Sequence, residues 1–104
     1  MVIAYRWGDE MVVPDDRTEA SLTIDGSQIG GSMGVNLFTG QIDDEFLFGP
    51  MATTRMAGPT ELIQQEEILL GHLQDADTLE VREDGMSLTR DGLLLVELER
   101  SGNL

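Results

Sequence analysis

The stretch Ala20-Ser21-Leu22-Thr23-Ile24-Asp25-Gly26 decides the fold class of this chain. Its apolar residues alternate with polar ones, so that Ala20, Leu22 and Ile24 share one face. This period of two is the pattern of a half-buried β-strand, and the Asp-Gly pair that ends it is typical of a tight hairpin turn. We therefore expect an antiparallel sheet in this part of the chain.

The same pattern continues outward from this stretch. Downstream, Asp84-Gly85 and Asp91-Gly92 are expected to be hairpin turns, with the last strand over 93–99. In the last strand, alternation places Leu94, Val96 and Leu98 on one face. Further short strands are expected at 46–48 and 51–56, where apolar residues are bounded by glycine or proline.

One segment, at about 59–74, has the pattern of a helix instead. Pro59 suits a first helical position, and an apolar stripe follows it at helical spacing. The stripe consists of Leu62, Ile63, Leu69, Leu70 and Leu73. We expect one α+β domain over 1–104, mostly antiparallel β, with a curved sheet or incomplete β-barrel and this helix packed against its apolar face.

Glu66 lies in the middle of the apolar stripe. A buried carboxylate is costly unless it is paired or hydrogen-bonded. We favour a structural role, in which backbone N–H groups or Arg55 bind it. The alternatives are a ligand-facing acid with a raised pKa inside a cavity, or a rotated helix that brings Glu66 to water. Ile68 and His72 lie off the stripe and are expected to form a small exposed patch.

Composition excludes several classes of chemistry. The 104 residues contain no cysteine, no lysine and one histidine, His72. Thiolate metal sites, a cysteine nucleophile and Schiff-base chemistry are therefore excluded. No catalytic motif or metal-binding spacing occurs, so we expect no enzyme activity, no catalytic residue, no metal and no cofactor.

The charge is strongly negative. Twenty acidic residues against six arginines give a formal net charge of −14, which opposes binding to nucleic acid. The acids fit a solvated surface, a salt-adapted source, or capture of a basic partner. No apolar run reaches the roughly 18 residues of a membrane helix. The chain is expected to be soluble as written, in the cytoplasm or, if a targeting segment was trimmed, in the cell envelope.

Two separated motifs resemble the META domain, or HslJ-like, family. The first runs from Ser21 to Gly26 and continues over 29–40, with the sequence IGGSMGVNLFTG; the second runs over 48–59, with FGPMATTRMAGP. The family usually has cysteine where this chain has Val35 and Gly58. The resemblance implies that these two positions lie close together in the fold and that the cysteines can pair in relatives.

The resemblance also implies a function class. Members are mostly bacterial envelope proteins linked to stress, so we expect a non-catalytic accessory or interaction protein. A second hypothesis is a carrier of a small acyl or other apolar ligand between sheet and helix, and a third is an acidic decoy for a basic protein.

The carrier cavity would be lined by Met33, Phe38, Phe46, Phe48, Met56, Leu69 and Leu73. The candidate ligand-binding residues are Asn36, Thr54, Arg55, Glu66, Phe38, Phe48 and Met56. A protein partner or small apolar ligand is expected, with the chain a monomer or weak dimer.

Overall fold

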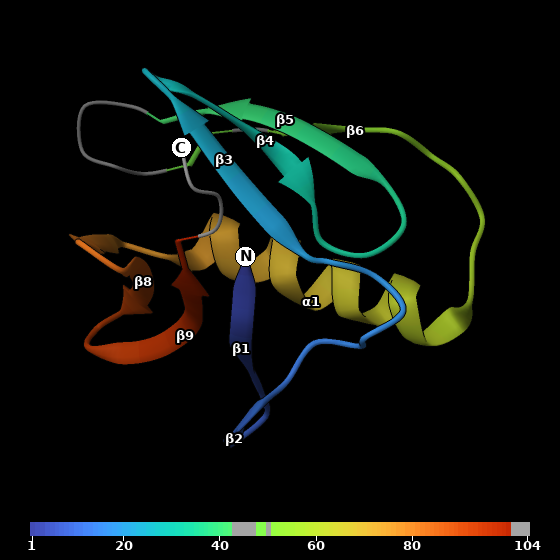
Figure 1. Cartoon of the computed structure of the whole chain (residues 1–104), viewed down its shortest axis with the longest axis horizontal. Helices are drawn as coiled ribbons and strands as arrows, with labels where there is room; N and C mark the ends of the chain where they lie inside the picture. The colour runs from blue at the N-terminus through green and yellow to red at the C-terminus, as the bar shows by residue number, and fades with distance from the viewer. Residues whose placement is uncertain (43–47, 50, 101–104) are drawn as a thin grey trace.

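The computed structural model describes residues 1–42, 48–49 and 51–100, and it is built from two antiparallel sheets and one helix (Figure 1). The first sheet has the strand order β2-β1-β9-β8-β7 and the second the order β3-β4-β5-β6. The strands are β1 (Val2–Trp7), β2 (Glu10–Val12), β3 (Ser21–Asp25), β4 (Gln28–Ser32), β5 (Leu37–Gln41), β6 (Ala52–Thr53), β7 (Thr78–Arg82), β8 (Gly85–Arg90) and β9 (Leu93–Glu99). The helix α1 spans Thr60–Asp75.

Figure 1 shows α1 crossing the molecule with β3, β4 and β5 on one side and β1, β8 and β9 on the other. A backbone hydrogen bond of 2.8 Å from Val2 N to Ala20 O joins the start of β1 to the residue before β3. Within the described ranges the two sheets do not close into a barrel. The expected α+β fold with an incomplete barrel and one helix is therefore confirmed.

The core fills the space between the sheets and α1. Leu69 and Leu73 reach it from the helix, Leu88 and Val96 from the first sheet, and Phe38 from the second. Burying each such side chain contributes about 1.5–3 kcal/mol. Helix packing therefore depends on the apolar stripe that the sequence predicts.

The three expected hairpins are present, as the pairs β3–β4, β7–β8 and β8–β9. Asp91 and Gly92 both have positive φ, at 51° and 82°, as a two-residue hairpin loop of this type requires. One expected turn residue is placed differently, because Gly85 belongs to β8 and pairs with Glu99. A Cβ on Gly85 would lie 2.1 Å from the carbonyl oxygen of Leu98, so close backbone approach explains this glycine.

In β9 the predicted alternation is interrupted. Leu88 pairs with Val96 and the next residue, Thr89, pairs with Leu94, so Leu95 has no partner across the ladder. This irregularity is a β-bulge, which reverses the facing of the residues beyond it. Leu95 and Val96 are consequently both buried, while Leu94 is only partly buried.

Three element boundaries differ from the expectation. The strand expected at 51–56 is limited to β6. Of the strand expected at 46–48, Phe48 forms an isolated bridge with Ile42, and Phe46 and Leu47 lie outside the described residues. The helix begins at Thr60, with Pro59 just before it as the cap residue. No helix in the described part of the chain is both long and apolar enough to cross a membrane.

Candidate functional site

The carboxylate of Glu66 is buried and is bound by the loop between β4 and β5. Its Oε1 accepts hydrogen bonds from the backbone N–H groups of Val35 at 2.9 Å and Asn36 at 2.5 Å. Its Oε2 accepts one from Asn36 Nδ2 at 2.9 Å. These donors satisfy the buried charge, as burial requires. The expected backbone partners are present, and the further bond comes from the Asn36 side chain rather than from Arg55.

Asn36 extends this network to the segment after β6. Its Oδ1 accepts hydrogen bonds from Thr54 Oγ1 at 2.9 Å and from the backbone N–H of Met56 at 2.6 Å. Thr54 Oγ1 in turn accepts one from the backbone N–H of Leu37 at 3.0 Å. We call Glu66, Asn36 and Thr54 the loop–helix clamp. It ties α1, the β4–β5 loop and the segment before the helix to one another.

Two glycines allow these segments to approach closely. A Cβ on Gly34 would lie 2.4 Å from the carbonyl oxygen of Leu62 in α1, so no larger residue fits without a backbone shift. A Cβ on Gly58 would lie 2.6 Å from Cγ2 and 3.4 Å from Cβ of Val35. The inference that Val35 and Gly58 lie close together is therefore confirmed.

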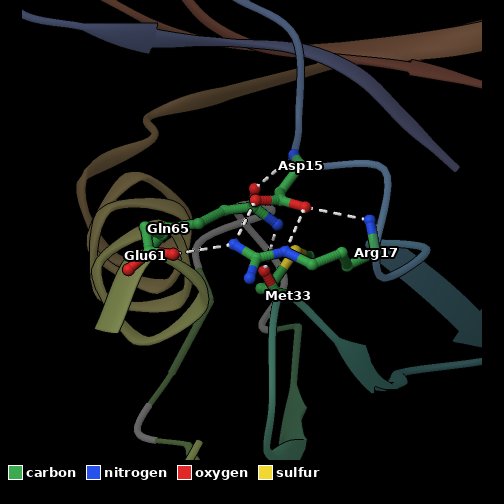
Figure 2. Close-up of polar contacts among 5 residues, drawn as sticks. All are labelled: Asp15, Arg17, Met33, Glu61 and Gln65. Atoms are coloured by element: carbon green, nitrogen blue, oxygen red, sulfur yellow. Dashed lines mark hydrogen bonds and ion pairs between the residues drawn. The ribbon is translucent and has the colours of Figure 1, made fainter. Parts of the chain in front are cut away.

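Gln65 is a second buried polar residue of α1, which the sequence analysis missed. Figure 2 shows its side chain reaching across to Asp15 and Met33. Oε1 accepts from the backbone N–H of Asp15 at 2.7 Å, and Nε2 donates to the carbonyl oxygen of Met33 at 2.9 Å. Its spacing of three and four residues from Leu62 and Leu69 places it on the buried face, and this signal was available in the sequence.

At the exposed end of this contact, Arg17 joins Asp15 to Glu61 (Figure 2). Its guanidinium lies 2.7 Å from a carboxylate oxygen of Asp15 and 2.9 Å from one of Glu61. The hydrogen bonds from Arg17 lower the pKa of Asp15 to about 2, and that of Glu61 is lowered by the same guanidinium. The pKa of Arg17 is raised correspondingly. The arrangement is a surface ion-pair group that holds the β2–β3 connection against the helix.

Of the remaining predicted site residues, Met56 reaches the clamp through its backbone, which hydrogen-bonds to the Asn36 side chain. Phe38 and Phe48 are buried in the core, whereas Arg55 is exposed and Met56 has 52% of its surface exposed. The Met56 side chain therefore does not line the interior cavity that the carrier hypothesis expects. The expected internal salt bridge of Arg55 is not among the ion pairs of the described residues.

At the described residues, the expected ligand cavity between sheet and helix is packed core. Met33, Leu69 and Leu73 have no solvent-accessible surface, so no water-sized space lies beside them. Phe46, the other aromatic residue expected there, lies outside the described residues. Met33, Leu69 and Leu73 therefore stabilise the fold by filling this space.

A cleft lined by both apolar and charged side chains instead lies at the surface, between β3 and the end of the first sheet. Its volume is about 500 Å³. Leu22 and Ile24 line it from β3, and Val81, Met86 and Leu98 line it from β7, β8 and β9. Val81 has 70% of its surface exposed, so the cleft presents apolar surface to solvent.

A polar group on the first sheet connects Arg82, Ser87 and Glu97. Arg82 donates to Ser87 Oγ at 2.7 Å and also binds Glu97, while Ser87 Oγ donates to Glu97 Oε1 at 2.6 Å. Ser87 and Glu97 are direct partners across the ladder, so the contact depends on strand register. The serine hydroxyl is thereby held by a carboxylate and a guanidinium, a structural arrangement on the sheet surface.

His72 contacts the backbone of β1. Its Nε2 lies 2.7 Å from the carbonyl oxygen of Arg6 and donates to it, because a carbonyl oxygen can only accept. Ile68 and His72 are both half-buried, so the expected exposed patch is not formed.

Across the described ranges, no group of three or more His, Asp or Glu side chains is placed to hold a metal ion.

The META domain family model matches residues 5–102. An NMR structure of a protein from Burkholderia xenovorans is similar with a TM-score of 0.75 and 25% sequence identity, over 98% of this chain and 80% of that one. A search of curated proteins found no match. With nearly its whole length covered by the family model, this chain belongs to the META domain family.

Proposed function

We propose that this domain is a non-catalytic interaction module whose partner is a protein with a basic surface. The observation that carries the proposal is the state of the interior. In the part of the chain that the structure describes, every buried side-chain nitrogen and oxygen has a hydrogen-bond partner. Glu66, Asn36 and Gln65 are bonded to one another or to backbone, so their polar groups are used in holding segments together.

The surface supports the choice of a basic partner. The chain has twenty acidic residues and only six arginines, and two of these arginines, Arg17 and Arg82, are already bound to acids. A field of this sign attracts cationic proteins and accelerates their association, most strongly at low salt. An accessory role in the envelope or in stress is what the family resemblance adds to this proposal.

A calorimetric titration tests the proposal. Poly-arginine is added to the domain at about 0.15 M salt, with poly-glutamate as the control. We expect saturable binding of poly-arginine that weakens as salt is raised, and none of poly-glutamate. A flat titration with poly-arginine would remove the basic partner from consideration.

A carrier of an apolar ligand is the second candidate, favoured by the cleft that Leu22, Ile24 and Met86 line. Native mass spectrometry of the purified domain, with a lipid extract of the same sample, distinguishes the two. We expect the mass of the chain alone. An acyl species at a fixed ratio, lost in Met86→Asp, would favour the carrier and place the ligand in this cleft.

A further inference from the structure

Trp7, the last residue of β1, lies half-exposed between two clefts that run along α1. The two clefts have volumes of about 360 Å³ and 330 Å³, and both are lined by Trp7 and Gln64. Trp7 is 46% exposed, and the ring centroid of the buried Tyr5 lies 6.4 Å from that of Trp7. An indole with one neighbouring ring and open space beside it offers an aromatic face to a ligand.

The two clefts differ in whether their carboxylates are already bound by an arginine. On one side, Asp15 and Glu61 are already bound by Arg17. On the other side the lining consists of Trp7, Gln64, Glu67 and Ile68, which we call the Trp7 cleft. Glu67 is exposed and belongs to none of the ion pairs formed by the described residues. Among the acidic residues that line the two clefts, Glu67 is therefore the one whose carboxylate is left to receive a cation.

We propose that the Trp7 cleft binds an arginine side chain of the basic partner, an inference that rests on the proposed function. A guanidinium stacks on an indole face and forms an ion pair with a carboxylate beside it, here that of Glu67. The methylene stem of the arginine would pack on the half-buried Ile68. Arginine suits the cleft better than lysine, because its planar group stacks while it donates.

Trp7 is the sole tryptophan of the chain, so its fluorescence reports directly on the cleft. The probe is a tetra-arginine peptide, and a tetra-citrulline peptide of the same shape but without charge is the control. Calorimetry on the same mixtures measures total binding independently. We expect a saturable change in Trp7 emission with tetra-arginine and none with tetra-citrulline.

Two charge-matched variants separate local contact from the overall field. Glu67→Gln removes the cleft carboxylate, and Glu83→Gln removes one from the exposed β7–β8 turn, which lines neither cleft. We expect Glu67→Gln to weaken tetra-arginine binding about two- to fivefold, the range for an exposed ion pair, and Glu83→Gln to leave it nearly unchanged. Equal effects of the two variants, or calorimetric binding without a change in Trp7 emission, would overturn the Trp7 site while leaving the proposed function standing. Absence of calorimetric binding would count against both.

Discussion

Replacement of Glu66 by leucine tests whether the loop–helix clamp holds the fold together. The carboxylate accepts hydrogen bonds from the backbone N–H groups of Val35 and Asn36 and from the Asn36 side chain. Leucine matches the apolar stripe and removes both acceptor oxygens, and with them all three hydrogen bonds. The variant therefore gains apolar contact but leaves three donors without a partner in a buried region.

The magnitude follows from these three donors. Each buried donor left unsatisfied costs about 1–3 kcal/mol, so the three donors together cost about 3–9 kcal/mol before any compensation. Added apolar burial by leucine offsets part of the gross cost, which brings the net loss towards the lower end of this range. For a domain of this size, the loss lowers Tm by at least about 12 °C.

Urea unfolding followed by circular dichroism measures the effect. Glu67→Leu is the matched control, because it makes the same change one residue further along α1 at an exposed position. We expect the control to stay within about 0.5 kcal/mol of the parent. Glu66→Gln should lie between the two, because one oxygen is kept and an amide donor then faces the Asn36 amide. If Glu66→Leu were as stable as the control, the clamp would not be a stabilising element and the argument would be wrong.

Other predictions concern close approaches and charges. Gly34→Ala should destabilise the fold by about 1–3 kcal/mol, because the new Cβ meets the backbone of α1. Gly71→Ala should stabilise the fold by up to about 1 kcal/mol, because open space surrounds a Cβ there and alanine favours the helix. Thermal melts of both variants measure the two effects. The pair Val35→Cys and Gly58→Cys should form a disulfide, since the 3.4 Å Cβ separation is close to the usual range, and should add about 3 kcal/mol in oxidised over reduced samples. The lowered pKa of Asp15, about 2 when folded, should make stability fall as pH drops from about 4 towards 2, and Asp15→Asn should reduce that slope in urea titrations. Retention of the full slope in the variant would assign it to other carboxylates.

Local patterns in the sequence predict most of the secondary structure. Alternation and Asp-Gly pairs indicate the hairpins, because a two-residue loop and the strands beside it depend on neighbouring residues. The bulge at Leu95 was not predicted, since it depends on which residue of β8 faces each residue of β9. Register is decided across the sheet, and no window of sequence contains it.

The same distinction between local sequence patterns and long-range contacts applies to the candidate site. Glu66 was singled out because a charge on an apolar stripe is visible in one helix, but its partners come from a loop some thirty residues earlier. Gln65 was not predicted to be a site residue, because a neutral amide carries no charge that would make a buried position stand out in the sequence. In both cases the helical period indicates burial, and only the packed structure identifies the partner.

The clamp also limits what family membership says about binding. Its residues Asn36, Thr54 and Glu66 lie in or beside the two motifs by which the family resemblance is noticed, and their polar groups bind one another and the backbone. Motifs used in this way specify how the loop, the helix and the sheets assemble, so they predict the fold of a relative rather than its ligand. Trp7 and Glu67 lie outside both motifs, so the proposed binding of a basic partner does not depend on the clamp. The comparison of Glu67→Gln with Glu83→Gln is therefore the more informative experiment on function, and Glu66→Leu the more informative one on the fold.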